Sequence, residues 1–321
     1  MPATYSNDAA GQRCAAPPVL IVGMYRSGTT MLAQMLEQLG LYMGRNLGHG
    51  FDEPLFFVNL NDWILQACGG RWDDPVHLEA LQSYPDLRSI MADYLRVNLC
   101  SPRSVSYFGW QNYREFRRHG SLAAPWGWKD PRTTFTLPMW LELFPDARII
   151  HICRNGVDVA RSVNKKWGPK PRVINEVGRL YARRRPLYYV RPMRTGFSFT
   201  LRAGNLEDCF ALWEEYVSEA EHWVRRLGDR AVTVRYEEFL ENPAPALSML
   251  NRFCGLGAAK SEIEQTASKV RPERGYAYRQ DRELAAFAET VSDRLAVHGY
   301  GAIHAITHRI EHFDCALAAC G

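Results

Sequence analysis

The segment from Pro18 to Met31 constrains the fold of this chain more than any other stretch. Residues 19–22 are apolar and mostly β-branched, which predicts a buried parallel strand. Apolar residues then recur at helical spacing up to a glycine suited to end a helix: Met31, Leu32, Met35, Leu36, Leu39 and Gly40. A strand that leads through a glycine loop into a helix is a common phosphate-binding unit. The loop amides point at the phosphate, and the first turn of the helix carries a partial positive charge. The sequence therefore predicts an α/β fold with an anion site near its start.

The glycines of this loop, Gly23 and Gly28, have the spacing of a nucleotide-binding P-loop. That motif continues with a lysine and a serine or threonine, which contact the terminal phosphates and Mg²⁺. Here Thr29 stands in the lysine position, and the cation, Arg26, lies inside the loop. The loop therefore favours a ligand with one terminal phosphate and an adjacent anion over Mg-ATP. An ordinary strand-to-helix turn is the alternative, but such a turn does not require four polar residues in an otherwise apolar unit.

The same loop resembles the one with which sulfotransferases begin. Those enzymes use 3′-phosphoadenosine 5′-phosphosulfate (PAPS). They bind its 5′-phosphosulfate with a loop that follows a strand and has the five-residue form [K/R]-[S/G]-G-T-[T/S]. This chain matches that form with Arg26, Ser27, Gly28, Thr29 and Thr30. The resemblance implies that these five residues bind the phosphosulfate group.

Length and composition favour a globular protein built on one α/β domain. The chain has 321 residues, 46% of them hydrophobic, and a mild formal charge of +4 that does not by itself suggest nucleic acid. We expect a disordered tail over residues 1–16 and a sulfotransferase domain over 17–321, with helical insertions at about 70–120 and 168–205. Eight cysteines without a C-x-x-C pair favour a reducing compartment over a disulfide framework.

The first residues do not have the pattern of a targeting segment. Residues 1–16 are polar and small, without the apolar region of a signal peptide. No apolar run approaches the ~18 residues needed to span a bilayer. We therefore expect a cytoplasmic protein with no integral membrane segment.

A second strand-turn-helix unit follows the same plan as the first. Residues 148–153 form an apolar strand, Arg154 begins the turn, and residues 157–166 have helical spacing. Ser162 lies eight residues after Arg154, a little over two helical turns, so both face the start of the helix. This predicts a second anion site, next to the first if the two strands are neighbours. Sulfotransferases place Arg and Ser at this spacing, and the resemblance implies that this pair binds the 3′-phosphate of PAPS.

Lys129 is the second candidate cation for the reaction. It begins a Lys-Asp-Pro segment that resembles one in protein-tyrosine and many bacterial sulfotransferases, located at a similar distance before the 3′-phosphate strand. The resemblance implies that Lys129 lies near the transferred sulfuryl group, together with Arg26. A solvated lysine at a strand end is the simpler alternative.

Glu53 is the candidate base. Steroid and phenol sulfotransferases have a histidine just after the corresponding lysine, and this chain has none there. It looks more like the group in which a glutamate after the first helix accepts the acceptor proton, which implies Glu53. Asp52 and His49 are neighbours with the same potential. An acid that merely stabilises a helix N-terminus is an equally good explanation of Glu53.

Tyr236 closes a third predicted strand, residues 231–235. Related enzymes have a similar segment close to the adenine, so stacking on the purine is one interpretation of Tyr236, and an aromatic cap on the core is the other. The remaining pattern predicts helices over 207–227, from about 236 to 254, over 283–297 and over 302–318.

Residues 165–202 combine many basic residues with aromatic ones and a single acid, Glu176. We favour a lid that closes over an anionic nucleotide and the acceptor. An acceptor-binding loop, a patch for an anionic partner such as single-stranded nucleic acid, and a solvated insertion are the alternatives. Farther on, His304, His308 and His312 form one stripe of a predicted helix, where surface or packing roles are favoured over a metal site.

These patterns predict a sulfotransferase that moves a sulfuryl group from PAPS to a hydroxyl of a small-molecule, lipid or glycan acceptor. PAP is the expected product, and no metal and no nucleic-acid partner are expected. A P-loop kinase or NTPase is the main alternative enzyme, although it needs a lysine after Gly28. A nucleotide- or polyanion-binding module without catalysis is the other alternative.

Overall fold

A computed structural model describes residues 16–45, 53–76, 78–191, 199–271 and 275–301. At its centre lies a four-stranded parallel sheet in the order β2-β1-β3-β4. The strands are β1 (Val19–Val22), β2 (Gly127–Lys129), β3 (Arg148–Cys153) and β4 (Ala231–Arg235). This confirms the predicted fold class, and it makes the two predicted phosphate-binding strands, β1 and β3, direct neighbours.

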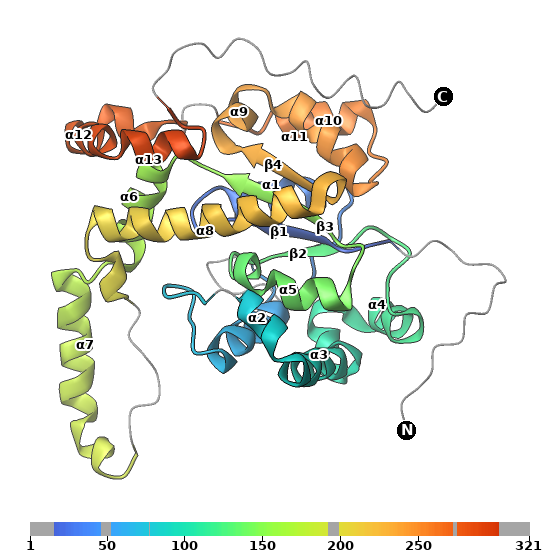
Figure 1. Cartoon of the computed structure of the whole chain (residues 1–321), viewed down its shortest axis with the longest axis horizontal. Helices are drawn as coiled ribbons and strands as arrows, with labels where there is room; N and C mark the ends of the chain where they lie inside the picture. Colours follow the sequence, from blue (N-terminus) through green and yellow to red (C-terminus); the bar gives the residue numbers. More distant parts are fainter. Residues whose placement is uncertain (1–15, 46–52, 77, 192–198, 272–274, 302–321) are drawn as a thin grey trace. The chain divides into compact units, whose positions relative to one another are not determined.

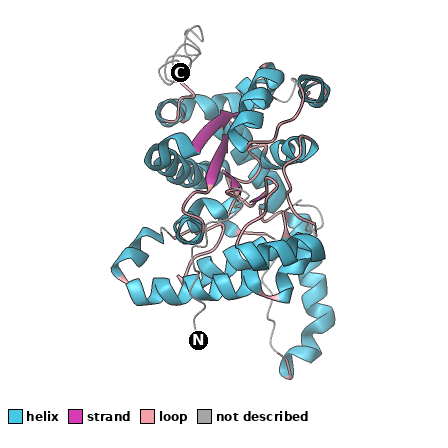
Figure 2. Ribbon diagram, turned by 90° about the vertical axis from the view of Figure 1, so that its right-hand side faces the viewer, coloured by secondary structure: helices cyan, strands magenta, loops and turns pink. Residues whose placement is uncertain are grey.

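Both faces of the sheet are buried, as parallel sheets require. In β1, Leu20 and Val22 belong to one hydrophobic cluster, while Val19 and Ile21 belong to another. The first cluster is covered by α2 (Leu55–Ala67), α3 (Pro85–Cys100), α4 (Val105–His119) and α5 (Thr133–Leu143). The second is covered by α1 (Thr29–Gln38), α9 (Tyr236–Glu241), α10 (Pro243–Cys254) and α11 (Lys260–Ala267). Figure 1 shows the two groups of helices on either side of the strands, and Figure 2 shows the strands enclosed between helices.

Three helices follow β3, and the first of them carries Ser162 of the predicted second anion site. They are α6 (Gly156–Trp167), α7 (Pro171–Arg184) and α8 (Leu206–Leu227). The connections contain short 3-10 helices, η1 (Leu78–Ser83), η2 (Pro102–Ser104), η3 (Arg185–Tyr189), η4 (Leu201–Ala203), η5 (Gly228–Arg230) and η7 (Ala277–Gln280). No helix within the described ranges is long and apolar enough to cross a membrane.

The edge strand β2 approaches β1 so closely that it needs a glycine. Val19 pairs with Gly127, and a Cβ on Gly127 would lie 1.8 Å from the Val19 carbonyl oxygen. The close pairing fixes Lys129, the last residue of β2, beside Ile21 of β1. The position of Lys129 at the carboxyl edge of the sheet therefore follows from this contact.

Two predicted helices are interrupted in the structure. The helix expected over 283–297 is divided into α12 (Arg282–Thr290) and α13 (Ser292–Val297). At the break Val291 has non-helical angles of φ −108° and ψ 14°, and the Thr290 hydroxyl donates to the Phe287 carbonyl at 2.7 Å. β-Branched and hydroxyl side chains lower helix propensity, which explains a break at this site. Similarly, Pro243 begins α10 as a separate helix after α9.

The chain divides into two compact units, residues 1–277 and 278–321. The first contains the sheet and the helices that cover it, and the second contains α12 and α13. The expected single domain over 17–321, with its tail and its insertions, remains a prediction. The helix expected over 302–318, with His304, His308 and His312, lies outside the described residues, as does most of the expected tail.

Candidate active site

The loop between β1 and α1 has the backbone of an anion cradle. Gly28 precedes α1 with a positive φ of 98°. Arg26 also has a positive φ, 71°, which residues other than glycine rarely adopt. A Cβ on Gly28 would lie 2.5 Å from the Tyr236 ring. Within the part of the chain that the structure describes, no side chain caps α1 and its first turn carries no acid. The uncapped amides of this turn are therefore suited to an anionic ligand.

Three of the predicted binding residues meet at this loop. The Arg26 Nε donates to the Ser162 Oγ at 2.8 Å, although 136 residues separate them. The Arg154 guanidinium donates to the Arg26 carbonyl oxygen at 3.4 Å. It also forms a 3.4 Å ion pair with Asp158, and it lies 4.7 Å from the centre of the Tyr236 ring. The loop cation and the predicted 3′-phosphate pair, Arg26, Arg154 and Ser162, therefore form one cluster. We call it the exposed cation cluster after Arg26, which is exposed, whereas the Arg154 side chain is 16% exposed.

Lys166 adds a positive charge that was not among the site residues predicted from the sequence. It lies one turn after Ser162 on α6, and its ammonium is 5.1 Å from the centre of the Trp167 ring. Burial lowers the pKa of Lys166, and the nearby Arg26 guanidinium lowers it further. The two cations therefore repel one another, and an anion between them would relieve that repulsion.

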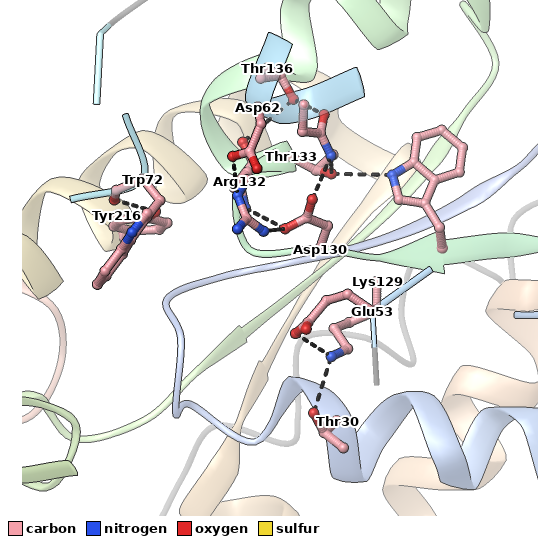
Figure 3. A network of polar contacts seen from close by, with 12 residues as sticks. Thr30, Glu53, Asp62, Trp72, Lys129, Asp130, Arg132, Thr133, Thr136 and Tyr216 are labelled. Atoms are coloured by element: carbon pink, nitrogen blue, oxygen red, sulfur yellow. Dashed lines mark hydrogen bonds and ion pairs between the residues drawn. The ribbon is translucent and has the colours of Figure 1, made fainter. Parts of the chain in front are cut away.

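A second group of charges lies at the end of β2 and is buried. The Lys129 Nζ donates to the Glu53 Oε1 at 2.6 Å and to the Thr30 Oγ1 at 3.1 Å. The side chains of Lys129 and Glu53 are only 1% and 7% exposed. Burial raises the pKa of the Glu53 carboxyl, and the Lys129 ammonium opposes this effect. Figure 3 shows this arrangement, which we call the buried ion pair.

Polar contacts behind the buried ion pair fix its backbone. Asp130 accepts from the Asn61 Nδ2 at 2.8 Å and from the Arg132 Nη1 at 3.0 Å. Asn61 is fully buried, and its oxygen accepts from the Thr136 hydroxyl and the Trp140 indole. Since Asn61 is on α2 and Asp130 follows Lys129, the network joins the helix that follows Glu53 to the strand that carries Lys129 (Figure 3).

Tyr236 contacts both the loop and the exposed cation cluster. Its side chain is 4% exposed, and the ring lies against Gly28 and below the Arg154 guanidinium. It also lines a cavity of about 160 Å³ with six other residues, Met31, Met35, Leu240, Lys269, Val270 and Arg271. Apolar side chains and two cations in one lining suit a purine nucleotide. Sequence reasoning did not single out Lys269 and Arg271, because no recognised motif contains them.

Aromatic residues surround the tip of the loop. The Tyr25 ring lies edge-on to Trp72, Trp167 and Tyr216, with centroid distances of 5.2, 5.4 and 6.3 Å. Two buried hydroxyls here, Tyr25 Oη and Ser27 Oγ, have no hydrogen-bond partner among the described residues. Buried polar atoms are usually paired, so the loop has hydrogen-bonding capacity left for a ligand.

The structure thus brings together the residues predicted for the site. Arg26, Ser162 and Arg154 are in contact, and Lys129 contacts both Glu53 and Thr30. Their catalytic and binding roles remain predictions. The alternative bases, Asp52 and His49, lie outside the described residues. In the described parts of the chain, no group of three or more metal-ligating side chains is present.

Most of the chain matches the profile of a known protein family. The sequence profile described as "Sulfotransferase family" matches residues 17–260, about three quarters of the chain. The chain therefore belongs to the sulfotransferase family. A comparison with curated proteins found no match.

Among solved structures, the chain is similar to sulfotransferases and to a retinol dehydratase. A sulfotransferase from Alicyclobacillus acidocaldarius is 17% identical, with a TM-score of 0.44 and coverage of 90% of this chain and 98% of that one. The sulfotransferase STF1 from Mycobacterium tuberculosis is 14% identical, with a TM-score of 0.45 and coverage of 88% and 77%. A retinol dehydratase in complex with androsterone and inactive cofactor PAP is 14% identical, with a TM-score of 0.41 and coverage of 91% and 83%.

Proposed function

We propose that the protein transfers a sulfuryl group from PAPS to a hydroxyl of an acceptor molecule. The observation that carries this proposal is the contact between the two predicted anion sites. The Arg26 side chain reaches Ser162, and Arg154 reaches the Arg26 backbone, at the edge where β1 and β3 run into helices. One nucleotide with phosphates at both its 3′ and 5′ positions would bridge these sites, whereas ATP has no group for the second.

Each part of the nucleotide has a matching part of the site. The backbone amides from Ser27 to Thr30 would hold the 5′-phosphosulfate at the uncapped helix start. Arg154 and Ser162 would hold the 3′-phosphate, and Tyr236 would contact the adenosine. The donor fits these residues because the loop holds two buried hydroxyls, those of Tyr25 and Ser27, that have no hydrogen-bond partner among the described residues, and an arginine, Arg26, in a backbone conformation that favours glycine.

Transfer then requires charge stabilisation and one proton acceptor. A new bond forms between the acceptor oxygen and sulfur, and the bond from sulfur to the bridging phosphate oxygen breaks, which leaves PAP. Arg26 and Lys129 would stabilise the charge on the sulfuryl and leaving oxygens. Glu53 would take the acceptor proton, and its burial makes it a stronger proton acceptor than an exposed glutamate.

A sulfation assay with PAPS tests this proposal. The purified protein is incubated with labelled PAPS and a panel containing a phenol, a glycan and a lipid alcohol, with Mg²⁺ or with a chelator. We expect PAP release and a labelled acceptor, at rates independent of Mg²⁺. ATP turnover that requires Mg²⁺ would instead support a kinase, and tight PAP binding without any turnover would support a binding module.

A further inference from the structure

An arm of the first unit carries charge that the proposed site does not use. We define the basic arm as residues 168–191, which contain α7 and η3. It leaves the body after Trp167, and the chain returns where the Thr200 amide donates to the Trp167 carbonyl oxygen at 2.9 Å. None of the residues of α7 is buried, and Figure 1 shows the helix extending away from the end of α6. The arm is therefore anchored at its base and exposed along its length.

The two sides of α7 differ in chemistry. Apolar side chains share one side of the helix: Val173, Ile174, Val177, Leu180 and Tyr181. Ile174 and Leu180 are 47% and 46% exposed on the same side of the helix, and a contiguous exposed apolar surface is typical of a binding site for a membrane or a protein. The opposite side carries Arg172, Arg179 and Arg183, together with Glu176, which pairs with Arg172 at 3.2 Å. Arg184, the last residue of α7, ends the apolar side.

Charge is concentrated in this arm to an unusual degree. Residues 168–191 contain seven lysines and arginines and one acid, Glu176, whereas the whole chain has a formal charge of only +4. The rest of the chain is therefore net negative. After α7 the arm adds exposed apolar residues, since Leu187 is 63%, Tyr189 is 89% and Val190 is 89% exposed.

We propose that the basic arm docks the protein on the surface of an anionic lipid bilayer. An amphipathic helix with arginines on one side and aliphatic residues on the other lies in the interface between headgroups and acyl chains. Its arginines then pair with lipid phosphates, and tyrosines such as Tyr181 and Tyr188, whose rings stack at 5.7 Å, lie at headgroup level.

Other partners fit these observations less well. Single-stranded nucleic acid pairs cations with aromatic stacking, but the apolar side of α7 is mainly aliphatic, and aliphatic side chains do not stack on bases. Contact between the arms of two copies of the chain would bring two strongly positive surfaces together, which is unfavourable. A bilayer of anionic lipid matches both the charge and the aliphatic surface.

Vesicle sedimentation with the full-length protein tests the proposal. Vesicles of phosphatidylcholine alone are compared with vesicles that also contain phosphatidylglycerol. We expect strong binding only to the anionic vesicles, weakened about fivefold for each arginine neutralised in Arg179→Gln and Arg183→Gln. The matched control is Arg117→Gln with Arg118→Gln, two exposed arginines of α4. This control should bind as the wild type does.

A second variant separates docking from simple attraction to polyanions. Leu180→Ser keeps every charge and should weaken binding to anionic vesicles about tenfold, while binding to heparin and to single-stranded RNA stays unchanged. All the substituted side chains are exposed, so near-UV circular dichroism should confirm an unchanged fold. The proposal is overturned by equal binding to neutral vesicles, by no binding to anionic ones, by no effect of Leu180→Ser, or by light scattering that shows a Leu180-dependent dimer without vesicle binding.

Discussion

The buried ion pair and the exposed cation cluster flank the same loop, yet they are built differently. Lys129 is almost completely enclosed and already has short contacts, 2.6 Å to Glu53 and 3.1 Å to Thr30. Arg154 has longer ones, 3.4 Å to the Arg26 carbonyl and 3.4 Å to Asp158, and Arg26 is exposed. The positions of Lys129 and Glu53 are therefore fixed by short contacts. Arg26, in contrast, is exposed to solvent, where an anionic ligand can bind and leave.

This difference has a thermodynamic consequence. Removing one partner of a buried ion pair leaves an uncompensated charge, which is costly, whereas exposed ion pairs contribute little. We therefore expect substitutions in the buried ion pair to change both stability and catalysis. Substitution of the exposed Arg26 should change catalysis or binding and leave stability nearly unchanged.

The largest expected effect is that of Lys129→Met. Glu53 would lose its partner, which should lower the free energy of unfolding by about 3–5 kcal/mol, and sulfuryl transfer should slow about 10²–10⁴-fold. Urea denaturation and initial rates measure the two effects. Lys260→Met is the matched control, since Lys260 is 90% exposed and lies 3.8 Å from Glu264, and it should change neither. A stable and fully active Lys129→Met protein would remove Lys129 from the mechanism.

Arg26→Ala should lower kcat about 10²–10⁴-fold, because the Arg26 charge would stabilise the transferring sulfuryl group. The loss of stability should be small, because Arg26 is exposed. The measurement is the initial rate at saturating PAPS, beside a thermal unfolding curve. Arg117→Ala, on α4, serves as a control for the loss of one exposed arginine. Near-native turnover in the Arg26 variant would show that the loop cation has no part in the chemistry.

The pH dependence of Glu53 should give a smaller effect with a defined sign. Burial raises the pKa of Glu53, so the folded state holds this proton to higher pH than the unfolded chain does. Ionisation of Glu53 therefore costs stability as pH rises through its folded pKa, while the rate should rise over the same range as the base becomes available. Glu53→Gln should lose both dependences. A Gln variant with the same pH profile would exclude Glu53 as the base, and a wild-type rate that follows an unperturbed glutamate would contradict the effect of burial on its pKa.

Ser162→Ala should have the smallest effect in this series. It removes one hydrogen bond to Arg26 and one donor for the proposed 3′-phosphate, which together correspond to about a five- to tenfold loss of PAP affinity. Isothermal titration with PAP measures this, and the conservative Ser162→Thr variant should retain most of the affinity. An Ala variant that binds PAP as well as the wild type does would leave Ser162 with a purely structural role.

Local patterns in the sequence were sufficient for much of the fold and for part of the site. The strand, loop and helix over residues 19–38 follow from neighbouring residues, as do β3 and α6, because apolar periodicity and glycine spacing are local properties. The second anion site was expected next to the first if their two strands are neighbours, and β1 does pair with β3.

Contacts between distant residues could not be predicted in this way. The bond from Lys129 to Glu53 joins residues 76 apart, and the bond from Asn61 to Asp130 joins residues 69 apart. Their geometry depends on how α2 packs against α5, which no single segment encodes. The break at Val291 was missed for another reason, since apolar spacing continues through it while the local backbone does not.

The account depends most on a single nucleotide that spans both anion sites, and the affinities of PAP and AMP test this directly. AMP has the 5′-phosphate but lacks the 3′-phosphate that Arg154 and Ser162 would hold. Titration should show that the wild type binds PAP about 10–100-fold more tightly than AMP, and that this preference disappears in Arg154→Ala. Equal affinities in the wild type, or an unchanged preference in the variant, would contradict the account.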